Sequence, residues 1–409
     1  MKYGLIGQNI SYSYSKIIHN LFGNNEYELY SLNSEEVKEL LVTKNFKGIN
    51  VTIPYKEMVI PYLDYVDESV KSIGACNLIV NKNGKLYGYN SDYYGFLELI
   101  KKENFIFKNQ NIAILGSGGT SKTVKSVLEN LDCKNIYIIS RSNKFYRYDE
   151  LEKLDIDIII NTTPVGGIND DSLICDIPSS CNSVIDVIYR PMLTKLLMAA
   201  KDKKIKYCNG LYMLVYQAYL SHLKFFDEKE DKNKINEVYV KLNKMNTNIY
   251  LIGMPYSGKT SVGKYLAYRL NKHFIDIDEE IVKDSGMSID DIFKLKGELY
   301  FRELESKEIK RHMFDFNSVI SLGGGAILKE ENMLNCLQTG EIYLIKRDID
   351  KIIFDESRPL TSSIEQYKSL FLEREKLYNK YSSKEYYNNS SLEEIVEEME
   401  CDFNETFNS

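Results

Sequence analysis

Two glycine-rich turns, each between a buried strand and a helix, constrain the fold of this chain more than any other feature. Gly116-Ser117-Gly118-Gly119 follows one apolar run, and Gly253-Met254-Pro255-Tyr256-Ser257-Gly258-Lys259-Thr260 follows another. Glycines at a strand-to-helix turn let backbone amides approach phosphate groups at the start of the helix. We therefore expect parallel α/β sheets with two separate nucleotide sites, the first for a dinucleotide and the second for a nucleoside triphosphate.

Composition restricts the partners and the compartment of the chain. The formal net charge of −7 over 409 residues argues against a nucleic-acid or anionic-membrane partner, because no excess of basic groups is available to neutralise phosphates. Apolar runs such as Ile156–Ile160 are too short to span a bilayer, and Met1–Gly7 has the pattern of a strand rather than of a signal peptide. The seven cysteines form no C-x-x-C pair, which argues against a disulfide framework or a zinc site. We expect a cytoplasmic protein that acts on small molecules.

Short β-branched strands alternate with amphipathic helical stretches, a pattern typical of parallel α/β domains. The domains that we expect are an α/β domain over residues 1–98 and 209–243, a Rossmann-type domain over 99–208, and a P-loop domain with a parallel sheet and a lid over 248–409. The last boundary falls in Asn243–Asn248, which is polar and lacks apolar periodicity. Asp227–Lys232 is expected to be an exposed helix end or loop. The acidic tail is expected to hold a helix over Leu392–Met399 and then fray.

The first glycine-rich turn lies in the context of a dinucleotide site. Asn111–Leu115 is the strand before it, a helix is predicted over Thr123–Leu131, and Ile136–Ile139 forms the next strand. An NAD site usually has an acidic residue after this second strand, but Ser140-Arg141-Ser142 follows here. An arginine flanked by hydroxyls suits a 2′-phosphate, which favours NADP; the alternative is that Arg141 is an ordinary solvated loop residue.

A lysine and an aspartate near the ends of two predicted strands form a candidate catalytic pair. Lys56 follows the strand that begins at Gly48, and Asp92 follows the strand that contains Tyr89. Such a pair can move a proton to or from a hydroxyl while hydride passes to or from a nicotinamide. From spacing alone, a surface lysine and a turn aspartate are the more common interpretation.

The segment around this pair resembles the shikimate dehydrogenase family over nearly all of residues 1–240. The ordered motifs that carry the resemblance are Gly4–Gly7 with Ser13-Tyr14-Ser15 and His19-Asn20, Asn50–Lys56, Gly74–Asn77, Asn90–Gly95, Asn161–Gly166, Asp186–Pro191 and Gly210–Gln217. The resemblance implies NADPH-dependent reduction of 3-dehydroshikimate, with Lys56 and Asp92 as the catalytic residues. The substrate-binding residues that it implies are Ser13, Ser15, Thr52, Lys56, Asn77, Asp92, Tyr189 and Gln217.

The glycine-rich turn and the same resemblance together assign the NADP site. Its residues are Gly116, Ser117, Gly118, Gly119, Thr120, Ser140, Arg141, Ser142, Thr162, Val187 and Gly210. The chain departs from the usual family motifs at Tyr12, Lys16, Leu78 and Ser91. An NAD-dependent dehydrogenase of the quinate type therefore stays as an alternative, and Arg141 with the missing acidic residue argues against it.

The second glycine-rich turn fits the pattern G-x-x-x-x-G-K-[ST] between the strand Ile249–Ile252 and a helix predicted over Val262–Leu270. Its amides can cradle phosphates, Lys259 can reach the outer phosphates, and the Thr260 hydroxyl can ligate Mg²⁺. These features predict an ATP site.

Charged residues after this turn suit a carboxylate-bearing phosphoryl acceptor. Phe274–Asp278 alternates apolar and acidic residues, so a strand would place Asp276 and Asp278 on one side, one near the metal and one near the acceptor hydroxyl. The alternative is a surface strand. Arg302, Arg358 and Arg374 can bind a carboxylate or phosphates, although each alone could be a surface arginine in a salt bridge. A helix over Ser369–Tyr378 is predicted to carry Arg374.

Together these segments, with Ser321–Gly325, resemble the shikimate kinase family over about residues 248–400. The resemblance implies that Asp278, Arg302, Gly324 and Arg374 bind shikimate, and that Thr260 and Asp276 hold Mg²⁺. The ATP-binding residues that it implies, including the lid arginine Arg358, are Tyr256, Ser257, Gly258, Lys259, Thr260, Ser261 and Arg358.

The two resemblances converge on one metabolite. The first implies reduction of the C3 ketone of 3-dehydroshikimate to shikimate, and the second implies phosphorylation of the new C3 hydroxyl to shikimate 3-phosphate, a step toward aromatic amino acids. Both reactions occur at the same oxygen, so they cannot share a pocket. The implied cofactors are NADP(H), ATP and Mg²⁺. A further alternative is that one half is a non-catalytic binding module, and intact Lys56, Asp92, Lys259 and Asp276 argue against it.

Overall fold

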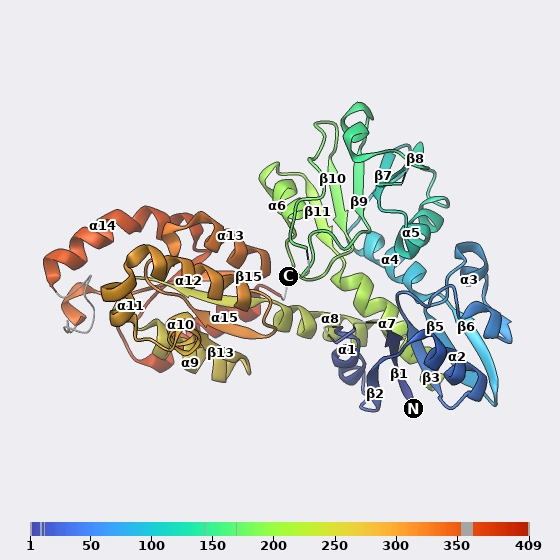
Figure 1. Cartoon of the computed structure of the whole chain (residues 1–409), viewed down its shortest axis with the longest axis horizontal. Coiled ribbons are helices and arrows are strands. Elements are labelled where there is room, and N and C mark those ends of the chain that lie inside the picture. The colour runs from blue at the N-terminus through green and yellow to red at the C-terminus, as the bar shows by residue number, and fades with distance from the viewer. Residues whose placement is uncertain are drawn as a thin grey trace. The chain divides into compact units, whose positions relative to one another are not determined.

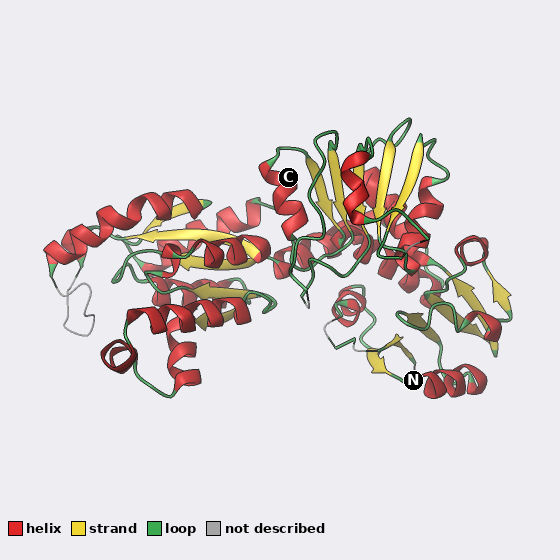
Figure 2. Ribbon diagram, turned by 45° about the horizontal axis from the view of Figure 1, so that its top comes forward, coloured by secondary structure: helices red, strands yellow, loops and turns green. Residues whose placement is uncertain are grey.

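The computed structural model describes residues 2–407 except 9, 12, 143, 169 and 353–362. The described chain forms two compact units (Figure 1). The first unit comprises Met1–Tyr189 and Thr194–Leu242, and the second comprises Arg190–Leu193 and Asn243–Ser409. Three separate sheets carry the strands, two in the first unit and one in the second (Figure 2). Among the described residues, no helix is long and apolar enough to cross a membrane.

The first sheet has the order β2-β1-β3-β5-β6-β4. The strands β1, β2 and β3 run parallel, and β5 joins β3 antiparallel. The strands are β1 (Tyr3–Gly7), β2 (Tyr27–Ser31), β3 (Gly48–Val51), β4 (Tyr65–Val66), β5 (Leu78–Lys82) and β6 (Lys85–Tyr89). The accompanying helices are α1 (Ser15–Leu21), α2 (Ser34–Thr43), α3 (Glu68–Ile73) and α4 (Ser91–Lys102), with a short 3₁₀ turn at Ile60–Tyr62.

The second sheet is parallel throughout and has the order β11-β10-β9-β7-β8. Its strands are β7 (Asn111–Leu115), β8 (Asn135–Ile139), β9 (Ile158–Asn161), β10 (Ser183–Asp186) and β11 (Lys206–Asn209). Helix α5 (Gly119–Leu128) packs against β7, and α6 (Lys195–Asp202) packs against β10 and β11. The helix predicted over Thr123–Leu131 therefore begins four residues earlier, because the glycine turn leads directly into its first turn. A 3₁₀ segment covers Tyr148–Lys153.

Two long helices close the first half of the sequence. Helix α7 (Leu211–Phe226) packs against α1 and α4, and α8 (Lys232–Asn246) follows after a turn. The exposed, charged turn predicted over Asp227–Lys232 is confirmed up to the start of α8. The polar stretch Asn243–Asn248, in which the last boundary is predicted, begins where the second unit resumes, and most of it is helical. Helix α8 runs through it to Asn246, and Asn246 and Asn248 are fully buried.

The third sheet belongs to the second unit, is parallel, and has the order β13-β14-β12-β15-β16. Its strands are β12 (Asn248–Ile252), β13 (His273–Asp276), β14 (Ser318–Ser321), β15 (Gly340–Lys346) and β16 (Lys384–Tyr387). The helices are α9 (Lys259–Arg269), α10 (Ile277–Ser285), α11 (Ile289–Lys296), α12 (Glu298–His312), α13 (Glu330–Thr339), α14 (Ile364–Tyr381) and α15 (Leu392–Glu405). Short 3₁₀ turns lie at Ala326–Leu328 and Ile349–Lys351.

The core of this unit follows from the two-residue period of its central strand. Tyr250 and Ile252 of β12 enter one apolar cluster, and Ile249 and Leu251 enter another. Successive side chains of a strand point to opposite faces, so a continuous apolar run indicates a sheet covered on both sides. Arg190 also belongs to the second unit, and its guanidinium donates to the backbone oxygens of Asn246 at 2.8 Å and of Asp315 at 2.6 Å.

Three further predictions for this unit are wrong in detail. The strand expected over Phe274–Asp278 ends at Asp276, whose side chain accepts from the backbone N–H of Asp278 and caps α10. Asp278 therefore lies in the first turn of a helix. The tail does not fray after Met399, because α15 continues to Glu405 and buries Phe403 against the second apolar cluster. The helix that carries Arg374 is also longer than predicted, at Ile364–Tyr381.

Candidate active sites

The first unit contains a cavity of about 240 Å³ that gathers the residues expected at the dehydrogenase substrate. Its wall includes all of the expected substrate residues, which are Ser13, Ser15, Thr52, Lys56, Asn77, Asp92, Tyr189 and Gln217. Three residues expected at the cofactor, Thr120, Val187 and Gly210, also line it. The cavity is thus bounded by residues predicted for the substrate and for the dinucleotide.

The candidate catalytic pair is in direct contact inside this cavity. Lys56 Nζ donates to Asp92 Oδ2 at 2.5 Å, and the two side chains are 18% and 14% exposed. Asp92 is held in the first turn of α4, which is capped by Asn90 through a hydrogen bond from the Tyr93 N–H. A largely desolvated lysine fixed by a carboxylate can donate a proton to a neighbouring substrate oxygen as the ammonium, and can take the proton back as the amine.

Hydrogen bonds preorganise the polar groups around the pair. The Ser91 backbone N–H donates to Asn77 Oδ1 at 2.7 Å, and Ser91 Oγ donates to Gln217 Oε1 at 3.3 Å. Elsewhere in the cavity wall, Ser13 Oγ donates to Ser15 Oγ at 3.0 Å. Ser91 thereby links Asn77, at the start of the β5 hairpin, to Gln217 on α7.

Asn50 lines the same cavity and was not among the residues predicted for the site. Its Oδ1 accepts from the Tyr27 hydroxyl at 2.9 Å, and its Nδ2 donates to Asn77 O at 3.2 Å and Ser221 Oγ at 2.8 Å. A polar residue between Ile49 and Val51 in a buried strand was the available signal. A buried amide needs such partners, and here they tie β3 to the site.

The first glycine-rich turn has the backbone shape that a dinucleotide site needs. Gly116 has φ +105°, and a Cβ there would lie 2.9 Å from Thr162 Oγ1. A Cβ on Gly118 or Gly119, in contrast, would meet nothing within 4 Å, so the turn leaves open space at the start of α5. Thr162 Oγ1 donates to Leu115 O at 2.6 Å and holds the neighbouring loop against the turn. These features fit a bound pyrophosphate.

The serines and arginine after β8 lie beside this turn. Ser117 Oγ and Ser140 Oγ are 3.1 Å apart, and the Ser142 N–H donates to Ser140 Oγ at 3.3 Å. Arg141 is exposed at this bend. An exposed guanidinium next to a hydroxyl-lined turn is accessible to a phosphate on the ribose.

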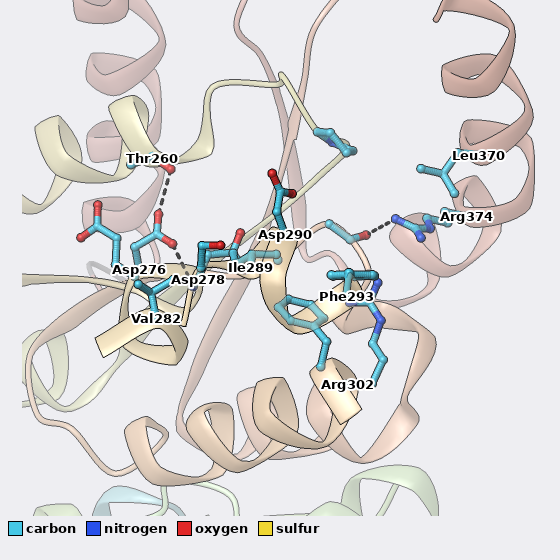
Figure 3. Close-up of a pocket in the computed structure, with 17 residues that line it drawn as sticks. Thr260, Asp276, Asp278, Val282, Ile289, Asp290, Phe293, Arg302, Leu370 and Arg374 are labelled. Carbon is cyan, nitrogen blue, oxygen red and sulfur yellow. Dashed lines mark hydrogen bonds between the residues drawn. The ribbon is translucent and has the colours of Figure 1, made fainter. Parts of the chain in front are cut away.

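The second unit contains two cavities that share walls. One of about 530 Å³ is lined by Asp278, Arg302, Gly324 and Arg374, and one of about 290 Å³ is lined by Tyr256, Gly258, Lys259, Thr260 and Ser261. Thr260, Asp276, Asp278 and Gly324 line both. In Figure 3, Thr260, Asp276 and Asp278 lie at one side of the larger cavity, and Arg302 and Arg374 lie at the other. Arg358 lies outside the described residues, and Ser257 lines neither of these two cavities but a third cavity of the same unit, of about 520 Å³.

The phosphate-loop lysine and the neighbouring threonine are held by short contacts. Lys259 Nζ donates to Gly253 O at 2.9 Å and Met254 O at 3.0 Å, so its charge sits inside the loop. Thr260 Oγ1 donates to Asp276 Oδ2 at 2.8 Å (Figure 3). A hydroxyl and a carboxylate side by side at the start of α9 are oxygen ligands of the kind that Mg²⁺ prefers.

The two arginines on the far side of the larger cavity are fixed by Glu305, which sequence reasoning missed, and by Gly324, which it included. Arg302 Nη1 donates to Glu305 Oε2 at 2.8 Å, and Arg374 Nη1 donates to Gly324 O at 2.9 Å. Burial raises the pKa of Glu305 to about 7, and the Arg302 guanidinium opposes that rise. The i, i+3 spacing of Arg302 and Glu305 on α12 was the signal for this ion pair. Two fixed guanidinium groups facing a pocket suit a carboxylate ligand.

Comparisons with protein families agree with this division of the chain. The profile of the shikimate dehydrogenase substrate-binding domain matches residues 5–79, and that of shikimate kinase matches residues 255–402. A shikimate dehydrogenase (NADP(+)) of Clostridium beijerinckii is 39% identical over 238 residues, which is 53% of this chain and 88% of that protein. One from Clostridium perfringens is 34% identical over 264 residues, or 59% of this chain and 97% of that protein.

Solved structures resemble the first unit. A chorismate mutase/shikimate 5-dehydrogenase fusion protein from Clostridium acetobutylicum is 34% identical with a TM-score of 0.54, covering 58% of this chain and 94% of that chain. Shikimate 5-dehydrogenase from Thermus thermophilus in complex with NADP(H) and shikimate is 25% identical with a TM-score of 0.52, covering 58% of this chain and 98% of that chain. The chain therefore belongs to the shikimate dehydrogenase family and carries a shikimate kinase domain in its C-terminal part.

Proposed function

We propose that the first unit reduces 3-dehydroshikimate to shikimate with NADPH and that the second phosphorylates shikimate at its C3 hydroxyl with MgATP. The observation that carries the first half of the proposal is the Lys56–Asp92 contact inside a cavity lined by every residue expected at the substrate. The second half is supported by the cavity that joins Thr260, Asp276 and Asp278 to Arg302 and Arg374.

In the reduction, Lys56 Nζ donates a proton to the C3 oxygen as the C3 carbon accepts a hydride. Asp92 Oδ2 accepts from Nζ and keeps the ammonium directed into the cavity. The Ser13 and Ser15 hydroxyls bind the substrate carboxylate, and Asn77 and Gln217 bind its ring hydroxyls. When bound, NADPH supplies the hydride.

In the phosphorylation, Asp278 accepts the proton of the C3 hydroxyl, and Arg302 and Arg374 hold the shikimate carboxylate. Lys259 places a positive charge in the phosphate loop, and Thr260 with Asp276 would hold Mg²⁺. When bound, MgATP supplies the phosphoryl group.

We assign residues 1–98 and 209–243 to the catalytic and substrate domain of the dehydrogenase, 99–208 to its NADP domain, and 248–409 to the kinase. Both reactions act on the same oxygen, so shikimate leaves one cavity before it enters the other. Joining the two enzymes in one chain raises the local concentration of the intermediate near the kinase.

A coupled assay tests the whole proposal. The protein is supplied with 3-dehydroshikimate, NADPH and MgATP, and NADPH consumption, ADP release and shikimate 3-phosphate are measured together. We expect NADPH loss without ATP, and ADP release only when shikimate is present or has been formed. Faster oxidation of quinate with NAD than of shikimate with NADP would replace the first half of the proposal with the quinate-type alternative. Absence of either activity in the intact chain would mark that half as a non-catalytic module.

A further inference from the structure

A buried carboxylate at the carboxyl edge of the second sheet joins two loops of the dehydrogenase unit. Asp186 is the last residue of β10 and is 0% exposed. Its Oδ2 accepts from Thr194 Oγ1 at 2.7 Å, and its Oδ1 accepts from Asn161 Nδ2 and from the Ile188 N–H, both at 3.1 Å. The three donors are neutral, so the carboxylate is held by hydrogen bonds and not by an ion pair.

One of the joined loops lies against the dinucleotide turn. Asn161 ends β9, and its own Oδ1 accepts from the Thr163 N–H at 3.0 Å and hydroxyl at 2.8 Å. Asn161 Nδ2 also donates to Val165 O at 3.1 Å. Thr162, which lies between Asn161 and Thr163 in the sequence, donates to Leu115 O, and its side chain would contact a Cβ added to Gly116. The hydrogen bonds of the Asn161 amide thus hold the loop after β9, which borders the predicted cofactor site.

The other joined loop forms a wall of the substrate cavity. Val187 and Tyr189 line that cavity, and the Ile188 N–H between them donates to Asp186. The Val187 N–H donates to Asn161 O at 3.0 Å, which connects the two loops a second time. Thr194, which donates to Asp186, also accepts from the Leu197 N–H and caps α6. Asp186 is therefore the common partner of a cofactor-side loop, a substrate-side loop and a helix start.

Placing a carboxylate here has an energetic cost. Burial raises the pKa of Asp186 to about 6, because desolvation outweighs the hydrogen bonds that favour the charged form. An apolar residue would fill the end of a buried strand without this cost, but it could not accept three hydrogen bonds from two loops and a helix.

We propose that Asp186 is a positioning residue for hydride transfer, which sets the distance between the cofactor-side loop and the substrate-side loop. The inference rests on the proposed dehydrogenase function and extends it to a residue that contacts neither reactant. Hydride transfer depends steeply on alignment, and a displacement of about 1 Å can lower the rate of a chemical step by about 10²-fold. Loss of the shared acceptor should therefore slow the transfer step itself.

The test is a single-turnover measurement on the full-length protein. Enzyme loaded with an equimolar amount of NADPH is mixed with saturating 3-dehydroshikimate, and the rate constant and the amplitude of the first phase of NADPH oxidation are recorded. A merely structural role would lower the amplitude, which reports the fraction of active enzyme. A positioning role lowers the rate constant while the amplitude is kept. NADPH deuterated at the transferred position identifies the slowed step as hydride transfer.

We expect Asp186→Val, which removes all three contacts, to lower the rate constant at least tenfold. Asp186→Asn should stay within about twofold of the wild type, because its oxygen can serve Asn161 and Ile188 while the Thr194 hydroxyl turns to accept from the new amide. The matched control is Asp157→Val. Asp157 precedes β9 at the opposite edge of the same sheet and accepts from the Asn111 N–H at 2.8 Å, so its loss should leave the rate constant unchanged.

A wild-type rate constant in Asp186→Val, with or without a lower amplitude, overturns the proposal. If Asp186→Val does not fold, Thr194→Val removes one of the three contacts to Asp186 together with the cap of α6, and Thr194→Ser restores both through its hydroxyl. A slower transfer step in Thr194→Val but not in Thr194→Ser supports the proposal, and equal rate constants overturn it. Failure of the wild-type protein to oxidise NADPH with 3-dehydroshikimate would instead reject the proposed function itself.

Discussion

Lys56 and Asp92 are 36 residues apart in the sequence, yet Lys56 Nζ lies 2.5 Å from Asp92 Oδ2. The contact lies in a cavity whose other polar groups include side chains from α7, from the start of the β5 hairpin, from the loop after β10 and from the segment at the start of α1. Both residues have fixed supports, because Lys56 O accepts from the Cys76 N–H at 2.8 Å and Asn90 caps the first turn of α4 that carries Asp92. The pair is therefore held in the cavity without any ligand.

Lys56→Ala should lower dehydrogenase turnover by about 10²-fold or more, because the proton donor at the ketone oxygen is lost. The measurement is the initial rate of NADPH oxidation with 3-dehydroshikimate. Lys71→Ala is the matched control, since Lys71 and Glu68 form an exposed pair with the same 2.5 Å separation. Kinase activity should be unchanged in both variants. Near-wild-type reduction by Lys56→Ala would contradict the assignment.

Arg141→Ala should weaken NADPH binding much more than NADH binding, because only NADPH carries the 2′-phosphate that the guanidinium contacts. A loss on the order of tenfold in NADPH affinity corresponds to one charge-assisted contact of about 1.4 kcal/mol. Titration of each cofactor by fluorescence provides the two dissociation constants. Arg147→Ala changes another exposed arginine near the same strand and should alter neither value. Equal effects of Arg141→Ala on both cofactors would reject the role.

Lys259→Ala should abolish phosphorylation of shikimate, because the outer phosphates lose a fixed positive charge in the loop. ADP release and NADPH oxidation are measured on the same sample, and NADPH oxidation should persist. Lys264→Ala serves as control: Lys264 lies on the same helix and makes an exposed pair with Glu279 at 3.3 Å. Residual phosphorylation near the wild-type rate would show that the loop acts without this lysine.

His19 should make the first unit sensitive to mild acid. Desolvation lowers the pKa of this buried ring, which stacks on Tyr27, to about 3, and the nearby His222 adds to the lowering. His19 of the unfolded chain takes up a proton near pH 6.5, whereas His19 of the folded chain takes one up only near pH 3. The contribution of this group to the free energy of unfolding is therefore complete above pH 6.5 and decreases as the pH falls from 6.5 towards 3. Between pH 6.5 and 5, this group alone should remove about 2 kcal/mol.

Urea unfolding of the wild type and His19→Gln over this pH range measures the effect. His19→Gln loses the ring stacking, so its unfolding free energy should start lower at every pH; the informative quantity is the slope. The variant's slope should be flatter by about 1.4 kcal/mol per pH unit. Parallel slopes would show that His19 is protonated in the folded protein.

Local patterns in the sequence determined the strands, the turns and the families. The apolar run before Gly116 and the run before Gly253 both form internal strands, and a glycine-rich turn connects each to a helix. These features depend on neighbours a few residues apart, so they can be predicted from spacing and residue type alone. The family resemblances also placed the expected substrate residues of the first unit, which line one cavity.

The tertiary structure decided which distant residues meet, and it corrected several local predictions. Asp278 reaches its cavity from a helix and not from a strand, because Asp276 caps α10 through its side chain. Asn243–Asn248 has a polar pattern that favours a linker, but buried hydrogen-bond partners such as Arg190 let α8 continue to Asn246. Asp186 became the meeting point of two loops only when the parallel order of β9 and β10 brought their carboxyl ends together. Such contacts depend on sheet order and burial, which no short stretch of sequence specifies.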